Sequence, residues 1–457
     1  LLGVARGASA AALLEFLRRA GMYTSPGKGG FVKRRFWLGL LLLVGIAGLS
    51  QPPAELFDYV HEARGTAVWE VVGTQDVGAG RITEIRLRSQ VWRGVPWNHV
   101  LFVCEPGNAL VQDVMVVYIA GGEGRADALL GLTMASFAGL RVAVLGGVPD
   151  QPLFGLREDA LIAHTFERYL QEGDSDWPLL LPMVQSAHAA MDALEALAPE
   201  LWGTELRGFV VTGASKRGWT TYLVAATAPE RVLGMAPIVF DFLNIPAQLG
   251  QQDEFLGGPS PMLRDYTALG LTAEFTATPE GARLPWIVDP YSYRNAYTMP
   301  KLVVVGSNDP YWTVGATSLY WPGLPDPKLL LVVPNAGHGV LDVGRVMGSL
   351  SLFARLVAQG EEPPRVESVV RLTPEGATVT VHADWVPVDA RLWVAESATP
   401  DFRQARWAEQ ELPVTAGGWE ARVLAAGTGY TAFFAEFVFE SDGLKLYVSS
   451  PTRVLGP

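Results

Sequence analysis

The sequence is poor in the residues that build covalent and metal cross-links. It has one cysteine, Cys104, and six histidines among 457 residues. A single cysteine cannot form a disulfide within the chain. Cys104 ends an apolar, strand-like run at 100–104, where cysteine is typically a small core residue. The histidines and the cysteine are not spaced like zinc ligands. We therefore expect no bound metal and no cofactor.

Positive charge is also scarce. The 35 Lys and Arg residues are outnumbered by 47 Asp and Glu residues, which gives a formal net charge of -12 at pH 7. No basic patch stands out beyond the Lys-Arg-Arg triplet at 33–35, so we expect no nucleic-acid partner. Hydrophobic residues make up 49% of the sequence, enough for a sizeable core. The length favours more than one domain.

Long apolar runs are limited to one short stretch, 36–50, directly after that basic triplet. A basic start, an apolar run and small residues before a Gln-Pro-Pro turn are typical of a signal peptide, here about 33–50 with cleavage after Ser50. The run is too short to cross a membrane comfortably. We expect a secreted or periplasmic protein without a stable membrane span, and an uncleaved N-terminal anchor is the alternative. The sequence does not indicate the oligomeric state.

The most informative motif is Gly-Ala-Ser-Lys-Arg-Gly at 213–218. A β-branched run precedes it and a helical pattern follows, as in the nucleophile elbow of α/β-hydrolases. Such a turn places Ser215 at the positive end of a helix, beside N–H groups that can hold an oxyanion. The usual signature is Gly-x-Ser-x-Gly, and Arg217 here takes the place of the second glycine. The alternative interpretation of Ser215 is an ordinary helix N-cap.

Two later loops supply the partners that a nucleophilic serine needs. Asp309 and His338 each follow a buried-type strand, and sites in parallel sheets gather at these strand ends. The chain order serine, acid, histidine is that of α/β-hydrolases. We predict Ser215 as nucleophile, His338 as base and Asp309 as the acid that orients it. Asp241, after an earlier strand, is the alternative acid or a substrate-binding residue.

The oxyanion hole requires two backbone donors. The N–H of Lys216, directly after the nucleophile, is one candidate. The second is expected from Gly121 and Gly122, in a glycine-rich loop after the strand-like run 113–119, where glycines permit close approach to substrate. Arg217 has two interpretations: it binds a substrate carboxylate bidentately, or it pairs with an acidic residue and secures the start of the helix.

Strand–helix alternation predicts an α/β fold: an α/β-hydrolase core, mostly a parallel sheet flanked by helices, at 51–362 after the upstream segment and signal peptide at 1–50. An insertion around 247–289 lacks strand patterns and has the position of a lid. Residues 363–457 are expected to form an all-β, Ig-like sandwich. Expected strands include antiparallel runs at 66–72, 82–92 and 99–104, parallel runs at 113–119 and 141–145, and C-terminal strands at 366–372, 377–383, 390–395, 418–424, 431–439 and 444–450. Expected helices include 54–63, 126–138, 158–170 and 180–197.

Several further blocks extend the elbow motif into a family pattern. They are Val-Asp-Pro-Tyr-Ser-Tyr-Arg at 288–294, Val-Pro-Asn-Ala-Gly-His at 333–338 and Gly-Tyr-Thr-Ala-Phe-Phe at 429–434. With the elbow, they resemble the PhoPQ-activated pathogenicity-related proteins, a family that includes autocrine proliferation repressor-like proteins. The resemblance implies an α/β-hydrolase core with Ser215, Asp309 and His338 as its triad. The elbow is also similar to that of glucuronoyl esterases, where a basic residue follows the nucleophile.

Two classes of function follow. The first is a secreted serine hydrolase that works through an acyl-enzyme, on an ester first and on a peptide or amide second. Its substrate would be a small molecule, a carbohydrate ester or a peptide. The second is a non-catalytic secreted signalling or binding protein on a hydrolase scaffold, since fold alone does not determine function. The presence of all three triad residue types favours the enzyme.

Overall fold

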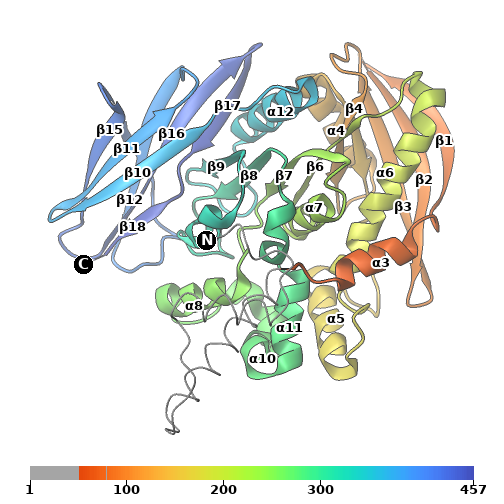
Figure 1. The fold of residues 1–457 in the computed structure, drawn as a ribbon, viewed down its shortest axis with the longest axis horizontal. Coiled ribbons are helices and arrows are strands. Elements are labelled where there is room, and N and C mark those ends of the chain that lie inside the picture. Colours follow the sequence, from red (N-terminus) through yellow and green to blue (C-terminus); the bar gives the residue numbers. More distant parts are fainter. Residues whose placement is uncertain (1–50, 79, 457) are drawn as a thin grey trace, which may run out of the picture. The chain divides into compact units, whose positions relative to one another are not determined.

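The computed structural model describes residues 51–78 and 80–456, so the expected signal peptide at about 33–50 lies outside the described residues. From Pro53 onward the chain forms one compact unit. Its centre is a nine-stranded sheet in the order β1-β2-β3-β5-β4-β6-β7-β8-β9 (Figure 1). The first three strands are antiparallel to their neighbours, and the strands from β4 to β9 are parallel. This topology is the α/β-hydrolase core that the sequence predicts.

The central strands are buried on both faces, as the continuous apolar runs predict. Every residue of β5 is buried, including the charged Arg141 at its start. The strands are β1 (Val68–Val77), β2 (Gly80–Trp92), β3 (Val95–Pro106), β4 (Val114–Ile119), β5 (Arg141–Leu145), β6 (Gly208–Ala214), β7 (Val232–Ile238), β8 (Lys301–Gly306) and β9 (Lys328–Val333). The expected parallel strands and the early antiparallel strands are thus confirmed, and Cys104 is buried on β3 as predicted.

Helices cover both faces of this sheet and divide its core in two. One hydrophobic cluster joins α3, α5, α6 and α7 to the sheet, and the other joins α4 and α12 to the opposite face. Side chains of β4 alternate between them, because Met115 belongs to the first cluster and Val116 to the second. These helices are α3 (Glu55–Ala63), α4 (Arg125–Ala138), α5 (Glu158–Glu172), α6 (Leu180–Trp202), α7 (Lys216–Thr227) and α12 (Val343–Gln359).

The insertion expected around 247–289 is helical. It lies beside α5 and the loop after β8 (Figure 1), since Ser260 Oγ donates to the Pro310 carbonyl at 2.7 Å and Tyr266 OH donates to Asp159 at 3.2 Å. Its elements are α8 (Ile245–Leu256), η1 (Pro261–Leu263), α9 (Arg264–Thr267), α10 (Leu271–Ala277) and α11 (Pro279–Val288), followed by η2 (Pro290–Ala296). The short turns η3 (Ala316–Leu319) and η4 (Trp321–Gly323) come before β9.

The C-terminal part is all β. Two antiparallel sheets, β10-β11-β15-β14 and one built on β12, β13, β16, β17 and β18, face each other, with Trp419 edge-on to Phe437 at 5.0 Å. A sandwich is therefore confirmed, whereas its Ig-like character and the boundary at 362 stay predictions. The strands are β10 (Val366–Thr373), β11 (Gly376–Ala383), β12 (Asp389–Ser397), β13 (Ala408–Glu411), β14 (Val414–Thr415), β15 (Gly418–Leu424), β16 (Tyr430–Ser441), β17 (Leu444–Ser449) and β18 (Arg453–Leu455).

None of the helices in the described part combines the length and the apolar composition needed to cross a membrane.

Candidate active site

Ser215 occupies a sharp turn between β6 and α7. Its backbone has φ of 60° and ψ of -125°, a combination that costs free energy for a non-glycine residue. A Cβ on Gly213 would lie 2.7 Å from the Arg217 carbonyl oxygen, and one on Gly218 would lie 2.7 Å from that of Ile238. Glycine at these two positions therefore allows α7 to start close against β6 and β7. Gly218 thus stands one residue after the second glycine of the usual Gly-x-Ser-x-Gly signature, and the close approach to Ile238 requires glycine there.

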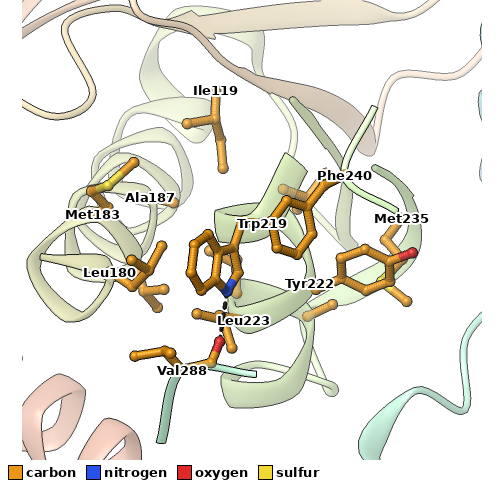
Figure 2. Packing of buried hydrophobic residues seen from close by; sticks show 14 of the residues in the cluster. Ile119, Leu180, Met183, Ala187, Trp219, Tyr222, Leu223, Met235, Phe240 and Val288 are labelled. Atoms are coloured by element: carbon orange, nitrogen blue, oxygen red, sulfur yellow. Dashed lines mark hydrogen bonds between the residues drawn. The ribbon is translucent and has the colours of Figure 1, made fainter. Parts of the chain in front are cut away.

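Buried side chains of α7 pack tightly directly after the Ser215 turn. Trp219 stacks on Phe240 with ring centroids 4.8 Å apart, and its Nε1 donates to the Val288 carbonyl at 2.6 Å. Figure 2 shows Trp219 and Tyr222 on α7, with Leu180 and Met183 of α6 on one side and Met235 of β7 on the other. Dense packing of this kind leaves the helix little freedom to move.

The structure brings Ser215, His338 and Asp309 into one hydrogen-bonded chain. Ser215 Oγ lies 2.8 Å from His338 Nε2, and His338 Nδ1 lies 2.7 Å from Asp309 Oδ2. An ionised carboxylate can only accept, so Nδ1 carries the proton and Nε2 is free to accept from the serine hydroxyl. The Asp309 side chain is 2% exposed and that of His338 is 24% exposed. The carboxylate is thus sheltered while the imidazole lies near solvent.

Backbone contacts hold the two partner loops together. A Cβ on Gly306, the last residue of β8, would lie 2.4 Å from the carbonyl oxygen of Ala336. The backbone N–H of Asn308 donates to that same oxygen at 2.9 Å. Asp309 Oδ1 also accepts from the Tyr311 amide at 2.9 Å, which orients the carboxylate. The loops after β8 and β9 therefore form one unit.

Tyr311 is a site residue that the sequence analysis missed. Its ring centroid lies 4.4 Å from that of His338. Burial raises the pKa of Tyr311 to about 12, with further increases from the Asp159 and Asp309 carboxylates, so the phenol is neutral at physiological pH. The signal that could have found it is its position, two residues after the predicted acid.

Lys216 and Arg217 both bind Glu158, at the start of α5. The Arg217 guanidinium makes two 2.8 Å hydrogen bonds to the Glu158 carboxylate, and its Nε donates to the Val148 carbonyl at 2.5 Å. Lys216 Nζ lies 2.8 Å from Glu158 and 3.6 Å from Asp159. Burial acts to raise the pKa of Glu158, but the two cations outweigh it and hold that pKa well below its usual range. Of the two interpretations of Arg217, the structure contains the pair with an acidic residue.

The predicted oxyanion loop lies against the elbow. A Cβ on Gly121 would be 2.4 Å from Arg217 Nη2, and one on Gly122 would be 2.5 Å from Asp127 Oδ2. The elbow and the loop after β4 are thus in contact where α7 begins at Lys216. The assignment of Gly121, Gly122 and Lys216 as oxyanion donors stays a prediction, because it depends on where a substrate oxygen binds.

Asp241 lies near Asp309, and its hydrogen-bond partners do not include His338. It is 5% exposed and accepts hydrogen bonds from Thr317 Oγ1 and, at 2.6 Å, from Tyr320 OH. Burial raises its pKa to about 7, and the nearby Asp309 adds to the increase. The two aspartates line a cavity of about 20 Å³, large enough for one water molecule. Of the two candidate acids, Asp309 is therefore the one beside the histidine.

A second serine–histidine pair, Ser89 and His99, provides an internal contrast. Ser89 Oγ lies 3.0 Å from His99 Nε2, but His99 Nδ1 faces the carbonyl oxygens of Gly146 and Gly147 instead of a carboxylate. Both side chains are buried, and burial lowers the pKa of His99 to about 4. Unlike the Ser215–His338 pair, this pair is buried and its imidazole has no carboxylate among its hydrogen-bond partners.

Among the described residues, no group of three or more His, Cys, Asp and Glu side chains is arranged to hold a metal ion.

Comparisons with known proteins agree on the kind of chain. A family model described as PhoPQ-activated pathogenicity-related protein matches residues 56–403. Autocrine proliferation repressor protein A of Dictyostelium discoideum is 27% identical over 457 residues, covering 89% of this chain and 90% of that protein.

Among solved structures, acetyl xylan esterase 1 from a Thermoanaerobacterium species has a TM-score of 0.46 and 16% identity, over 68% of this chain and 95% of that chain. An acetyl xylan esterase from a Paenibacillus species has a TM-score of 0.44 and 12% identity, over 63% and 90% of the two chains. The strand order of this chain, and not these distant likenesses, identifies its fold.

Proposed function

Because the chain belongs to the PhoPQ-activated pathogenicity-related protein family and has an α/β-hydrolase fold, we propose that it is a serine hydrolase. The observation that carries the proposal is the chain of two short hydrogen bonds from Ser215 through His338 to Asp309. Its directions are those required for nucleophilic attack, because the imidazole nitrogen facing the serine is free to accept a proton. The strained backbone of Ser215 supports the same role.

The reaction proceeds through an acyl-enzyme. Ser215 Oγ attacks the substrate carbonyl while His338 Nε2 takes the hydroxyl proton, and the oxyanion is held by backbone donors at Lys216 and the Gly121–Gly122 loop. The tetrahedral intermediate collapses, the bond to the leaving group breaks, and His338 protonates that group. A water molecule then gives a proton to His338 and attacks the acyl carbonyl, which forms a second tetrahedral intermediate. That intermediate collapses, the bond to Ser215 Oγ breaks, and His338 returns the proton to Oγ as the acid leaves.

We propose esters as the first substrate class and peptides or amides as the second, since alcohols leave more readily than amines. Small-molecule and carbohydrate esters belong to the first class. Lys216 and Arg217 give little support for an acidic substrate, because both already pair with the carboxylate of Glu158, and Lys216 also pairs with that of Asp159. Secretion remains part of the proposal, and it rests on the segment at about 33–50.

The alternative is a non-catalytic signalling or binding protein on the same scaffold. The observation in its favour is the name of the Dictyostelium relative, which describes repression of proliferation. Hydrolysis that depends on Ser215 separates the two proposals.

The test is hydrolysis of a panel of aryl, acetylated-sugar and uronate esters and of peptide amides by the purified protein. Ser215→Ala and His338→Ala should lower kcat by roughly 10³- to 10⁶-fold while circular dichroism shows a folded protein. Ser89→Ala is the matched control, since it removes a serine from the buried pair and should retain most activity. Equal rates for Ser215→Ala and the unmodified protein would overturn the proposal.

A further inference from the structure

The last part of the loop between β12 and β13, residues 402–407, contacts the loop that carries the acid. Asn308, directly before Asp309, directs its side-chain Nδ2 at three carbonyl oxygens of that segment. The distances are 2.7 Å to Ala405, 3.2 Å to Phe402 and 3.4 Å to Arg403. One side-chain amide therefore contacts three residues of a distant segment from the position directly before the acid.

The same segment contacts the loop that carries the histidine. Asn335, three residues before His338, donates from Nδ2 to the Trp407 carbonyl at 3.0 Å and accepts from the Trp407 amide at 2.8 Å. This reciprocal pair resembles one rung of a β-ladder. Asn335 has a φ of 57°, a left-handed conformation that asparagine tolerates better than most residues.

Ser307 joins the two asparagines. Its Oγ donates to Asn308 Oδ1 at 2.6 Å and accepts from the Asn335 amide at 2.8 Å. The hydrogen bonds thus run without a break from Trp407 through Asn335 and Ser307 to Asn308. The loop after β8, which carries Asp309, and the loop after β9, which carries His338, both belong to this network.

The 402–407 segment is itself firmly held. Phe402 and Trp407 are 1% and 2% exposed, and both belong to the hydrophobic cluster that includes the hydrolase core. The Trp407 ring lies 5.1 Å from that of Phe434 on β16, and Arg403 forms a 2.7 Å ion pair with Asp401. A segment fixed in this way can serve as a reference point for neighbouring loops.

We propose that the C-terminal β sandwich is a working part of the active site, because its 402–407 segment sets the positions of Asp309 and His338 through the positioning residues Asn308 and Asn335. The proposal rests on the proposed hydrolase function. Its physical basis is the steep dependence of catalysis on geometry: a misplacement of 1 Å can cost about 10²-fold in rate.

Other contacts of the sandwich differ from these. Glu436 on β16 pairs with Arg345 on α12, and Ser449 Oγ accepts from the Val332 amide of β9. They attach the sandwich to a helix and a strand and leave the two loops untouched. A role in stability alone would need only such contacts. The asparagine contacts instead reach the residues that flank the acid and the base.

The test uses the full chain with Asn308→Ala and Asn335→Gly, the second chosen because glycine keeps the left-handed backbone without strain. Asn108→Ala is the matched control, since Asn108 lies in an exposed turn after β3 at the opposite end of the sheet. We expect kcat for an ester to fall about 10- to 100-fold in each test variant with little change in KM. The assay temperature is well below the unfolding temperature of each variant. The control should keep the unmodified rate.

A second readout is proton NMR of the strongly deshielded hydrogen between His338 Nδ1 and Asp309, which reports on this bond whether or not the protein turns over substrate. We expect this resonance to weaken or move in both test variants and to stay unchanged in Asn108→Ala. Variants with an intact resonance and unmodified kcat would overturn the positioning role and leave the hydrolase proposal standing. An altered resonance in a protein with no activity at all would instead contradict the hydrolase proposal.

Discussion

Two carboxyl groups lie behind His338 in very different surroundings. Asp309 accepts hydrogen bonds from the imidazole of His338 and from the backbone amide of Tyr311. Asp241 is buried beside Tyr320 and its pKa is raised to about 7 by that burial. Of the two, Asp241 is therefore the group whose surroundings favour the neutral, protonated form.

The raised pKa of Asp241 predicts a specific pH dependence of stability. The folded protein binds this proton more tightly than the unfolded chain, in which the group titrates near 3.8. The resulting stabilisation is complete below that pH and is lost as the pH rises through about 7. Asp241→Asn cannot titrate, so its free energy of unfolding should decline less than that of the unmodified protein between pH 4 and 7.

Urea unfolding at several pH values measures this difference. Asp76→Asn, at a side chain that is 84% exposed, serves as the control and should follow the unmodified profile. Parallel profiles for Asp241→Asn and the unmodified protein would show that folding does not raise the pKa of Asp241.

Residue positions were predictable where they depend on local pattern. The proximity of Ser215, Asp309 and His338 could be predicted because each follows a parallel-type strand in a recognisable loop. The pairing of Arg217 with Glu158 was one of two alternatives, and it could not be decided because the two residues meet only through the fold. The contacts of Asn308 and Asn335 were missed for the same reason, since their partners lie more than 70 positions away.

At the scale of elements, the site depends on backbones that approach closely. Gly306 ends β8 where the loop after β9 crosses it, and a Cβ there would lie 2.4 Å from the Ala336 carbonyl oxygen and 2.6 Å from that of Gly337. Backbone cannot move aside as a side chain can. A side chain at this position would therefore push the His338 loop away from the acid.

Gly306→Ala should cost about 1–3 kcal/mol of stability through this overlap. The displaced histidine loop should also lower kcat by about 10²-fold. Gly250→Ala is the matched control, because an added Cβ on that α8 residue meets nothing within 4 Å. At this helical position alanine should increase the free energy of unfolding by about 0.5–1 kcal/mol. Thermal unfolding and ester hydrolysis measure both effects, and full activity in Gly306→Ala would contradict the close approach.

Elements were predicted well where they are long and periodic. The parallel strands, α4 and α6 follow from apolar runs and helical spacing. The shortest strands, β13, β14 and β18, have two to four residues each and were not predicted, since so few residues carry no clear alternation. Their pairing is decided by neighbouring strands.

At the scale of the whole molecule, a buried ion pair ties the sandwich to the hydrolase core. Glu436 on β16 is completely buried and pairs with Arg345 on α12, which also lies over the Tyr447 ring. Removing one member of a buried pair leaves the other charge buried without a partner. Arg345→Met should therefore lower the free energy of unfolding by about 3–5 kcal/mol. Both regions should be destabilised together, because they share one continuous core.

Hydrogen exchange across β8 and β16 measures this loss in the two regions at once. Arg345→Met combined with Glu436→Gln should recover most of the stability, since no unpaired charge remains. Arg81→Met breaks an exposed pair with Asp76 and should change stability by less than about 0.5 kcal/mol. Faster exchange confined to β16 would contradict the cooperative unit.

The central claim is that Ser215 is an activated nucleophile, and the most direct measurement is labelling with a fluorophosphonate probe followed by peptide mass spectrometry. We predict rapid modification at Ser215 alone, lost in Ser215→Ala and His338→Ala and retained in Ser89→Ala. A folded protein that stays unlabelled at Ser215, or is labelled equally in His338→Ala, would contradict the account.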